Sequence, residues 1–454
     1  NRSLISHHKE EKYMKFRKAM ALLLAGTMAL SMAACGGGSS SSSSDSSSSD
    51  AESTDSTDSS DSSDVTLSVT IWDSNQEPGL TQIMNDFTEK TGIKTKVSVV
   101  KWDEYWTLLE SGAQGGSLPD VFWMHSNEAV RYMSNDILLD LTDKIADSDK
   151  LEMDKFPEDI KEMYQWDGKT YAVPKDIDTI AMWYNKDMFD EAGIDYPDGS
   201  WTWDEFYDIA EKLTKEDGSQ YGFAANPSNE QDTWMNIVYS MGGRVLTDDN
   251  KSGFDDPNTI KAMEFVDKCV KNVIPPASTM SETGTDVLFG SGKVAMISQG
   301  SWMVSAFKDN DYIKEHCDVA RLPKDAETGE SVSLYNGLGW AASANTDMPD
   351  EAFQLIEWFG SKDMQKKQAD LGVTMAAYEG MSDGWVNSVD CFNLQPYMDA
   401  MDNIVFRPHT NATLAWWNPM CEELKKPWND EESMDDACKN IVTIMNDAIA
   451  EESY

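Results

Sequence analysis

The order of apolar and polar residues after position 64 predicts alternating strands and helices. Residues 65–71 alternate apolar with polar side chains, which is the two-residue period of a strand. Residues 79–91 carry apolar side chains at helical spacing, and Gly92 stands where a helix is expected to end. Residues 94–100 are again strand-like. A strand, a helix and a strand in this order predict the unit from which parallel sheets are built.

The alternation continues further along the chain. A helix is expected over residues 103–114, where Gly115 and Gly116 end it, and a buried strand over residues 119–124. The predicted fold class is therefore α/β. Thr202, followed three residues later by Glu205, predicts a capping box, so the neighbouring Trp201 and Trp203 are interpreted as structural residues.

The first 64 residues have a different pattern. Basic residues after Met14 precede an apolar run at 19–32, which is the form of a secretory signal and is shorter than the about 20 residues of a membrane span. Residues 1–34 are interpreted as upstream sequence and this signal. Ala33-Ala34-Cys35 resembles a bacterial lipobox, which would make Cys35 the lipidated residue of a membrane anchor. Free secretion is the alternative.

The segment that follows Cys35 is interpreted as a tether. Residues 36–64 contain 16 Ser and seven acidic residues, so they have almost no apolar side chains to bury. A chain of this composition is extended and flexible, with a reach on the order of 30 Å. Together with Cys35, it would hold a folded body away from the membrane.

Composition narrows the function of that body. The chain has 454 residues, and 37 Lys and Arg against 80 Asp and Glu give a net charge of −43, which argues against nucleic acid as a partner. Its 16 Trp exclude a wholly disordered chain. The 390 residues after position 64 exceed what one hydrophobic core usually serves, so two lobes are expected. The cysteines show no C-x-x-C spacing, and the sequence leaves open whether one internal disulfide forms.

Six motifs in the body resemble one family. They are GGSLPDVFW at 115–123, YAVP at 171–174, WYNKDMFDEAG at 183–193, WTWDEF at 201–206, FGSGKVAM at 289–296 with GSW at 300–302, and NGLGW at 336–340. In this order and spacing they resemble the extracellular solute-binding proteins of ABC importers, in the sugar-binding group that includes maltose-binding protein.

The resemblance implies a two-lobe binding-protein fold (type II) with the ligand cleft between lobes joined by hinge crossings. Lobe 1 would comprise residues 65–178 plus 322–374, and lobe 2 residues 179–321 plus 375–454. The protein would capture a mono- or oligosaccharide by lobe closure and deliver it to the permease. It would work as a monomer, without cofactor or metal, on the outer face of the cytoplasmic membrane of a Gram-positive bacterium.

Polar residues that follow predicted strands are candidates for ligand binding. Ligands in open α/β sheets bind at the carboxyl ends of strands, where Asp73 and Asn75 follow the first strand and His125 and Asn127 follow the third. An ordinary turn is the alternative for the first pair, and a buried structural histidine is the alternative for His125.

Further candidates come from the resemblance and from the aromatic content. Asp178 matches an acidic contact near the hinge, Trp302 matches a position that stacks on sugar, and one of Trp416 and Trp417 matches another. Trp102, Trp234 and Trp340 are weaker candidates, since a tryptophan is by default a core residue.

Other chemistries are disfavoured by the sequence. Residues 248–253 resemble the start of a calcium loop, but the twelfth position is Thr259 rather than a carboxylate, so a turn is expected. The motifs of serine hydrolases, zinc proteases and P-loop enzymes do not occur. A surface lectin or adhesin and a glycoside hydrolase are the alternative functions.

Overall fold

The computed structural model describes residues 65–451, which belong to one compact unit spanning residues 62–454. The predicted signal, the lipidated Cys35 and the tether lie outside the described residues. No helix among the described residues is long and apolar enough to cross a membrane.

The first sheet contains the three strands predicted from the N-terminal pattern. Its order is β2-β1-β3-β12-β6, in which β1 pairs in parallel with β2 and β3 while β12 runs antiparallel to β3 and β6. The strands are β1 (Thr66–Ile71), β2 (Lys94–Val99), β3 (Val121–Met124), β6 (Ala172–Pro174) and β12 (Gly339–Ala342). The sheet is thus mixed rather than wholly parallel, because β12 alone runs opposite to the other four strands.

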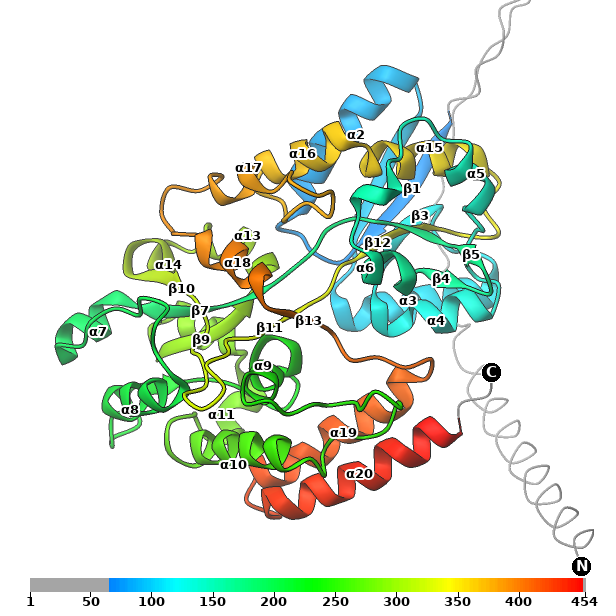
Figure 1. The fold of residues 1–454 in the computed structure, drawn as a ribbon. Helices are drawn as coiled ribbons and strands as arrows, with labels where there is room; N and C mark the ends of the chain where they lie inside the picture. Colours follow the sequence, from blue (N-terminus) through cyan, green and yellow to red (C-terminus); the bar gives the residue numbers. More distant parts are fainter. Residues whose placement is uncertain (1–64, 452–454) are drawn as a thin grey trace, which may run out of the picture. The chain divides into compact units, whose positions relative to one another are not determined.

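Helix α2 (Glu77–Thr91) confirms the predicted amphipathic pattern. Its apolar residues Leu80, Ile83, Met84 and Phe87 are buried, and Gly92 ends the helix in the left-handed conformation at φ +80°. Figure 1 shows α2 beside α15 (Pro349–Gly360) and α16 (Lys362–Asp370), which come from far along the chain. The three helices contact one another.

The second sheet has the order β10-β7-β9-β8 and shares no strand with the first. Strand β7 pairs antiparallel with β10 and β9, and β8 pairs in parallel with β9. All six residues of β7 are buried, which fits a strand with both faces covered. The strands are β7 (Ile180–Asn185), β8 (Tyr221–Phe223), β9 (Val294–Gly300) and β10 (Cys317–Ala320).

The chain passes between the two sheets more than once. It leaves the first sheet after β6 and enters the second at β7, and it returns through β11 (Ser333–Tyr335), which pairs with β13 (Ile404–Phe406), before β12. We call the residues around the first sheet lobe 1 and those around the second lobe 2. The predicted α/β, two-lobe fold is confirmed, while the exact lobe boundaries stay predictions.

The remaining elements are mostly helices on the faces of the two sheets. They are α3 (Trp102–Gly115), α4 (Ser126–Ser134), α5 (Thr142–Ala146), α6 (Glu158–Met163), α7 (Lys186–Ala192), α8 (Trp203–Leu213), α9 (Met235–Ser240), α10 (Pro257–Asn272), α11 (Ala277–Glu282), α12 (Thr285–Gly290), α13 (Val304–Phe307), α14 (Asp311–His316), α17 (Asp383–Val386), α18 (Gln395–Asp399), α19 (Thr413–Trp428) and α20 (Met434–Ala450), with the hairpin of β4 (Gln165–Trp166) and β5 (Lys169–Thr170).

Three local predictions have outcomes here. The capping box of Thr202 and Glu205 is present at the start of α8. The calcium-like segment is a turn, closed by a bridge between Leu246 and Ser252. The five cysteines of the described residues are free thiols, so no disulfide forms among them.

Candidate functional site

A cavity of about 540 Å³ is lined by residues from both lobes. Lobe 1 contributes the segment after β1 and the start of α3, and lobe 2 contributes the segment after β9 together with residues of α12 and α13. Six of the eleven predicted binding residues line it: Asp73, Asn75, Trp102, His125, Asp178 and Trp302. This volume is in the range of sites for small organic ligands.

The segment after β1 is an ordered turn that fixes a carboxylate at the cavity. The Asp73 carboxylate accepts hydrogen bonds from the backbone N–H of Asn75 at 2.8 Å, from the Asn75 amide at 3.1 Å and from the Gln76 amide at 2.9 Å. A side chain that bonds the backbone two residues on is typical of an Asx turn. The turn that the sequence left as an alternative is therefore real, and its residues line the cavity as well.

Aromatic rings from lobe 1 form one wall. The Trp72 ring packs edge-on against Trp102 at 5.1 Å, against Tyr105 at 5.0 Å and against Trp123 at 4.8 Å between centroids. Trp123 and Tyr105 are buried, whereas Trp102 is 41% exposed. Buried rings thus support two indoles, Trp72 and Trp102, whose remaining surface faces the cavity.

His125 belongs to the cavity wall and also begins a helix. Its Nδ1 accepts the backbone N–H of Asn127 at 3.1 Å and caps α4. Nε2 therefore carries the proton of the neutral ring, and it lies 3.4 Å from the amide of Asn336. Burial, followed by the nearby Arg407 cation, lowers the pKa of His125 well below its usual value, so the ring is neutral at physiological pH.

Trp302 provides an aromatic surface from lobe 2. It lies in a short 3-10 turn directly after β9, where Gly300 precedes it. A side chain at position 300 would overlap the Trp302 ring, so the glycine is needed for the close approach of ring and backbone. This explains why the motif reads Gly-Ser-Trp.

Asp178 lies at a crossing between the lobes. One carboxylate oxygen accepts hydrogen bonds from the backbone N–H of Asn336 at 3.1 Å and from the side-chain amide of Gln231 at 2.8 Å. The backbones of Asp178 and Asn336 also form a β-bridge. Burial, and then the neighbouring Asp176 carboxylate, raise the pKa of Asp178 to about 8. The carboxyl group is therefore largely protonated at neutral pH and serves as both donor and acceptor.

The neighbouring carboxylate has a cationic partner. Asp176 forms an ion pair with Lys175, whose ammonium is buried and also donates to the amide oxygen of Gln76 at 2.9 Å. This ammonium lies 4.5 Å from the centroid of the Trp123 ring. Lys175 thus lies behind the cavity wall, where its ammonium already bonds to Asp176 and Gln76.

Asn127 and Trp417 lie in a buried cluster around Arg407 rather than at the cavity. The guanidinium donates to Glu230 at 2.8 Å and to the Asn127 amide oxygen, and it stacks 3.9 Å from the centroid of the Trp417 ring. The Arg407 side chain is 4% exposed and that of Glu230 is 12% exposed. Since Asn127 begins α4 in lobe 1 and Glu230 lies in the π-helical turn Glu230–Trp234 of lobe 2, this cluster joins the two lobes.

The other three predicted tryptophans are core residues. Trp340 stacks on Phe359 at 4.2 Å, Trp234 donates to the carbonyl of Pro227 at 3.1 Å, and Trp416 donates to the hydroxyl of Thr410 at 3.0 Å. Each of the three is 0% exposed. They do not line the cavity.

Twelve of the residues that line the cavity were not predicted, among them Trp72, Gln231, Asp286 and Met303. Trp72 and Met303 adjoin predicted residues, so the rule that ligands bind beyond strand ends would have found them. Asp286 and Gln231 lie in short helical segments without any distinguishing pattern, and no sequence signal marks them.

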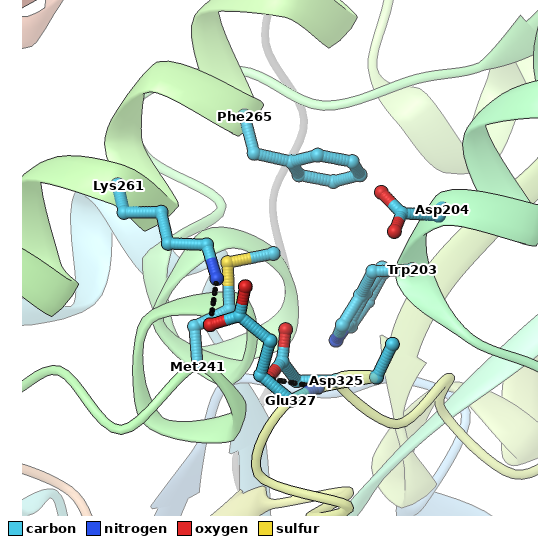
Figure 2. Close-up of a pocket in the computed structure, with 8 residues that line it drawn as sticks. Trp203, Asp204, Met241, Lys261, Phe265, Asp325 and Glu327 are labelled. Carbon is cyan, nitrogen blue, oxygen red and sulfur yellow. Dashed lines mark hydrogen bonds and ion pairs between the residues drawn. The ribbon is translucent and has the colours of Figure 1, made fainter.

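A second, smaller pocket lies apart from this cavity, in lobe 2. Figure 2 shows Trp203 and Phe265 on one side of it and the ion pair of Lys261 and Glu327 on the other. It encloses about 130 Å³, room for a few water molecules at about 30 Å³ each.

The comparisons with known proteins agree with this geometry. The family profile described as bacterial extracellular solute-binding protein matches residues 82–384. The chain belongs to this family. Its relatives and structural neighbours are binding proteins rather than enzymes, and the family is extracellular.

Individual relatives cover most of this solute-binding protein. A galactooligosaccharide-binding protein of Bacillus subtilis is 26% identical over 342 residues, 71% of each chain. The maltodextrin-binding protein of the same bacterium is 24% identical over 454 residues, 95% of this chain and 96% of its own. The ABC substrate-binding protein of Listeria monocytogenes solved with cycloalternan has a TM-score of 0.78 and 21% identity, and covers 86% of this chain and 100% of its own. That last likeness shows the fold.

Proposed function

We propose that this solute-binding protein captures a mono- or oligosaccharide in the cavity between its lobes and delivers it to the permease of an ABC importer. The observation that carries the proposal is the cavity wall, where Trp72 and Trp102 of lobe 1 and Trp302 of lobe 2 line one space with carboxyl and amide groups. Sugars have apolar C–H faces and polar hydroxyl edges, and such a wall complements both.

Lobe closure is the expected response to the ligand. A solute shifts a protein toward the closed state only if it binds that state better, which requires contacts to both lobes. Asp73 and Trp302 supply these contacts from opposite sides, and Asp178 lies at the crossing between them. Relatives named for galactooligosaccharide and maltodextrin binding support a sugar as the solute.

The site of action follows from the N-terminal sequence. A lipidated Cys35 and the tether of residues 36–64 would hold a monomeric body at the outer face of the cytoplasmic membrane of a Gram-positive bacterium. Replacing Cys35 by alanine in the full chain is expected to move the protein from the membrane fraction to the medium. Retention in the membrane fraction would contradict the lipid anchor.

Ligand titration tests the central proposal. Glucose, maltose, maltotriose, cellobiose and galactobiose are titrated, with glycine and spermidine as non-sugar solutes, while the melting temperature and tryptophan fluorescence are recorded. A sugar at 100 times its Kd is expected to stabilise the protein by about 2.7 kcal/mol. Small-angle scattering should show a smaller radius of gyration with that sugar. Stabilisation by a non-sugar solute alone, or release of reducing ends from a sugar, would overturn the proposal.

A further inference from the structure

We propose that the cavity selects its saccharide by charge: it prefers a sugar with a free amino group to the neutral sugar, and it rejects the corresponding uronate. This inference rests on the proposed function and names the class of sugar that the same site takes. It follows from which charged groups line the cavity and which of them already have partners.

The charged groups at the cavity are all acidic. Four carboxyl groups line it, those of Asp73, Asp176, Asp178 and Asp286. Among the described residues that line the cavity, none is a lysine or an arginine, and the single histidine, His125, is neutral. A bound anion would therefore meet no cation at the wall, while it loses its hydration.

Two buried cations close to the cavity wall already have partners. Lys175 forms an ion pair with Asp176 and donates a hydrogen bond to Gln76. Arg407 forms an ion pair with Glu230, donates to Asn127 and stacks on Trp417. Turning either cation toward a ligand would leave a buried carboxylate without its partner, which is strongly unfavourable. Neither is thus available to neutralise a uronate or a sugar phosphate.

Two of the four carboxyl groups keep an uncompensated negative charge. Asp176 is neutralised by Lys175, and Asp178 is largely protonated at neutral pH. Asp73 is held only by amide and backbone N–H groups, and Asp286 has no ion pair within the described part of the chain. A ligand therefore meets about two negative charges.

These two charges come from opposite lobes. Asp73 follows β1 in lobe 1, and Asp286 lies in the first turn of α12, which packs on β9 of lobe 2. Closure around a neutral sugar brings like charges toward one another, whereas an ammonium between them is attracted to both. The indole faces of Trp72, Trp102 and Trp302 favour a cation as well. An amino sugar therefore stabilises the closed state more than its neutral counterpart.

Matched sugars separate charge from shape. Gluco-, galacto- and manno-configured sugars are each titrated in the neutral, amino and uronate form at pH 7, with calorimetry and thermal shift as readouts. On the scaffold that binds, the amino form is expected to bind several-fold more tightly than the neutral form, and the uronate at least tenfold more weakly. A uronate that binds as tightly as the neutral sugar overturns the inference, and so does an amino form that binds more weakly.

Variants locate the effect. Asp286→Asn and Asp73→Asn are expected to reduce the ratio of amino to neutral affinity by at least threefold each. In Asp73→Asn the amide oxygen can still accept the two bonds from Asn75, whereas the bond from the Gln76 amide is lost. The matched control is Asp311→Asn, whose carboxylate is 98% exposed on α14. Its ratio should equal that of the unaltered protein. Unchanged ratios in both cavity variants would refute the assignment of the charges.

The proposed function and this inference fail in different ways. Binding of sugars without any charge preference overturns the inference and keeps sugar capture. Binding of spermidine with no response to any sugar overturns sugar capture, and the inference about sugars falls with it.

Discussion

Arg407→Ala tests whether the buried cluster beside the cavity holds the protein together. Arg407 and Glu230 are nearly inaccessible to water and pair at 2.8 Å, so removal of the cation leaves a buried carboxylate without compensation. Breaking such a pair costs about 3–5 kcal/mol. The loss of the stacking contact with Trp417 adds to this cost. We expect Arg407→Ala to lower the free energy of unfolding by about 4 kcal/mol.

The cost should depend on pH in a known direction. Burial raises the pKa of Glu230, and Arg407 opposes this rise. Without Arg407 the pKa of Glu230 in the folded state rises further. At a pH between the ordinary pKa of glutamate and this raised pKa, the folded variant therefore binds a proton that the unfolded chain has released. Stability that comes from a raised pKa is lost as pH increases. The variant should therefore be less destabilised at pH 5 than at pH 8.

Urea unfolding followed by tryptophan fluorescence measures these effects, compared at equal m-value. The double variant Arg407→Met with Glu230→Gln removes both charges and should recover about 2 kcal/mol, since replacement of a whole buried pair is often tolerated. Lys439→Ala is the control, because its pair with Asp435 has side chains 65% and 54% exposed, so solvent screens the pair and it contributes little to stability. A loss below about 1 kcal/mol in Arg407→Ala, or no recovery in the double variant, would refute this account.

Three further predictions concern the cavity and the core. Trp302→Ala should weaken binding of the best sugar by about 2 kcal/mol, roughly thirtyfold in Kd by calorimetry, and an unchanged Kd would remove Trp302 from the site. Asp178→Asn should flatten the pH dependence of stability. The pKa of Asp178 is about 8 in the folded state and 3.8 in the unfolded chain, so protonated Asp178 contributes its full stability below the unfolded pKa. This contribution falls by about 1.4 kcal/mol per pH unit between pH 5 and 7. Equal slopes in urea unfolding would contradict it. Trp340→Ala should cost about 3–5 kcal/mol of stability as a core cavity, and a free energy of unfolding in urea within about 1 kcal/mol of the parent's would argue against that core role.

Local pattern predicts the first part of the fold well. Strand β1, helix α2 and strand β2 follow from side-chain period alone. The apolar face of α2 is buried, the apolar residues of β1 are buried, and β2 alternates exposed with half-buried residues up to Val97. The antiparallel β12 was not predicted in the first sheet, since its partners β3 and β6 are distant in sequence. Pairing between distant strands leaves no local pattern to read.

The tryptophans show where sequence reasoning on the site ends. Trp302 and Trp340 both follow a glycine-containing motif, yet Trp302 lies just beyond the end of β9 and Trp340 lies within β12. A residue past a strand end can face the cavity, whereas one inside a doubly covered strand is buried. The position relative to the strand end therefore carried more information than the residue type.

The Arg407 cluster had no sequence signal at all. Its partners Asn127, Glu230 and Trp417 come from three distant segments that only the folded chain brings together. Asn127 was predicted to bind ligand because it follows the third strand, and Trp417 because it matches a stacking position of the family. Their observed role is to satisfy a buried cation.

In the proposed function, Asp178 couples ligand binding to lobe closure through a single carboxyl group. The oxygen that accepts from Asn336 and Gln231 belongs to a side chain that also forms part of the cavity wall. A substitution there alters the resting balance of open and closed forms together with ligand preference. Trp102 and Asp286 line the same cavity but take no part in the bridges between the crossing segments, so evolution of a new specificity is expected to proceed through them with less effect on the hinge.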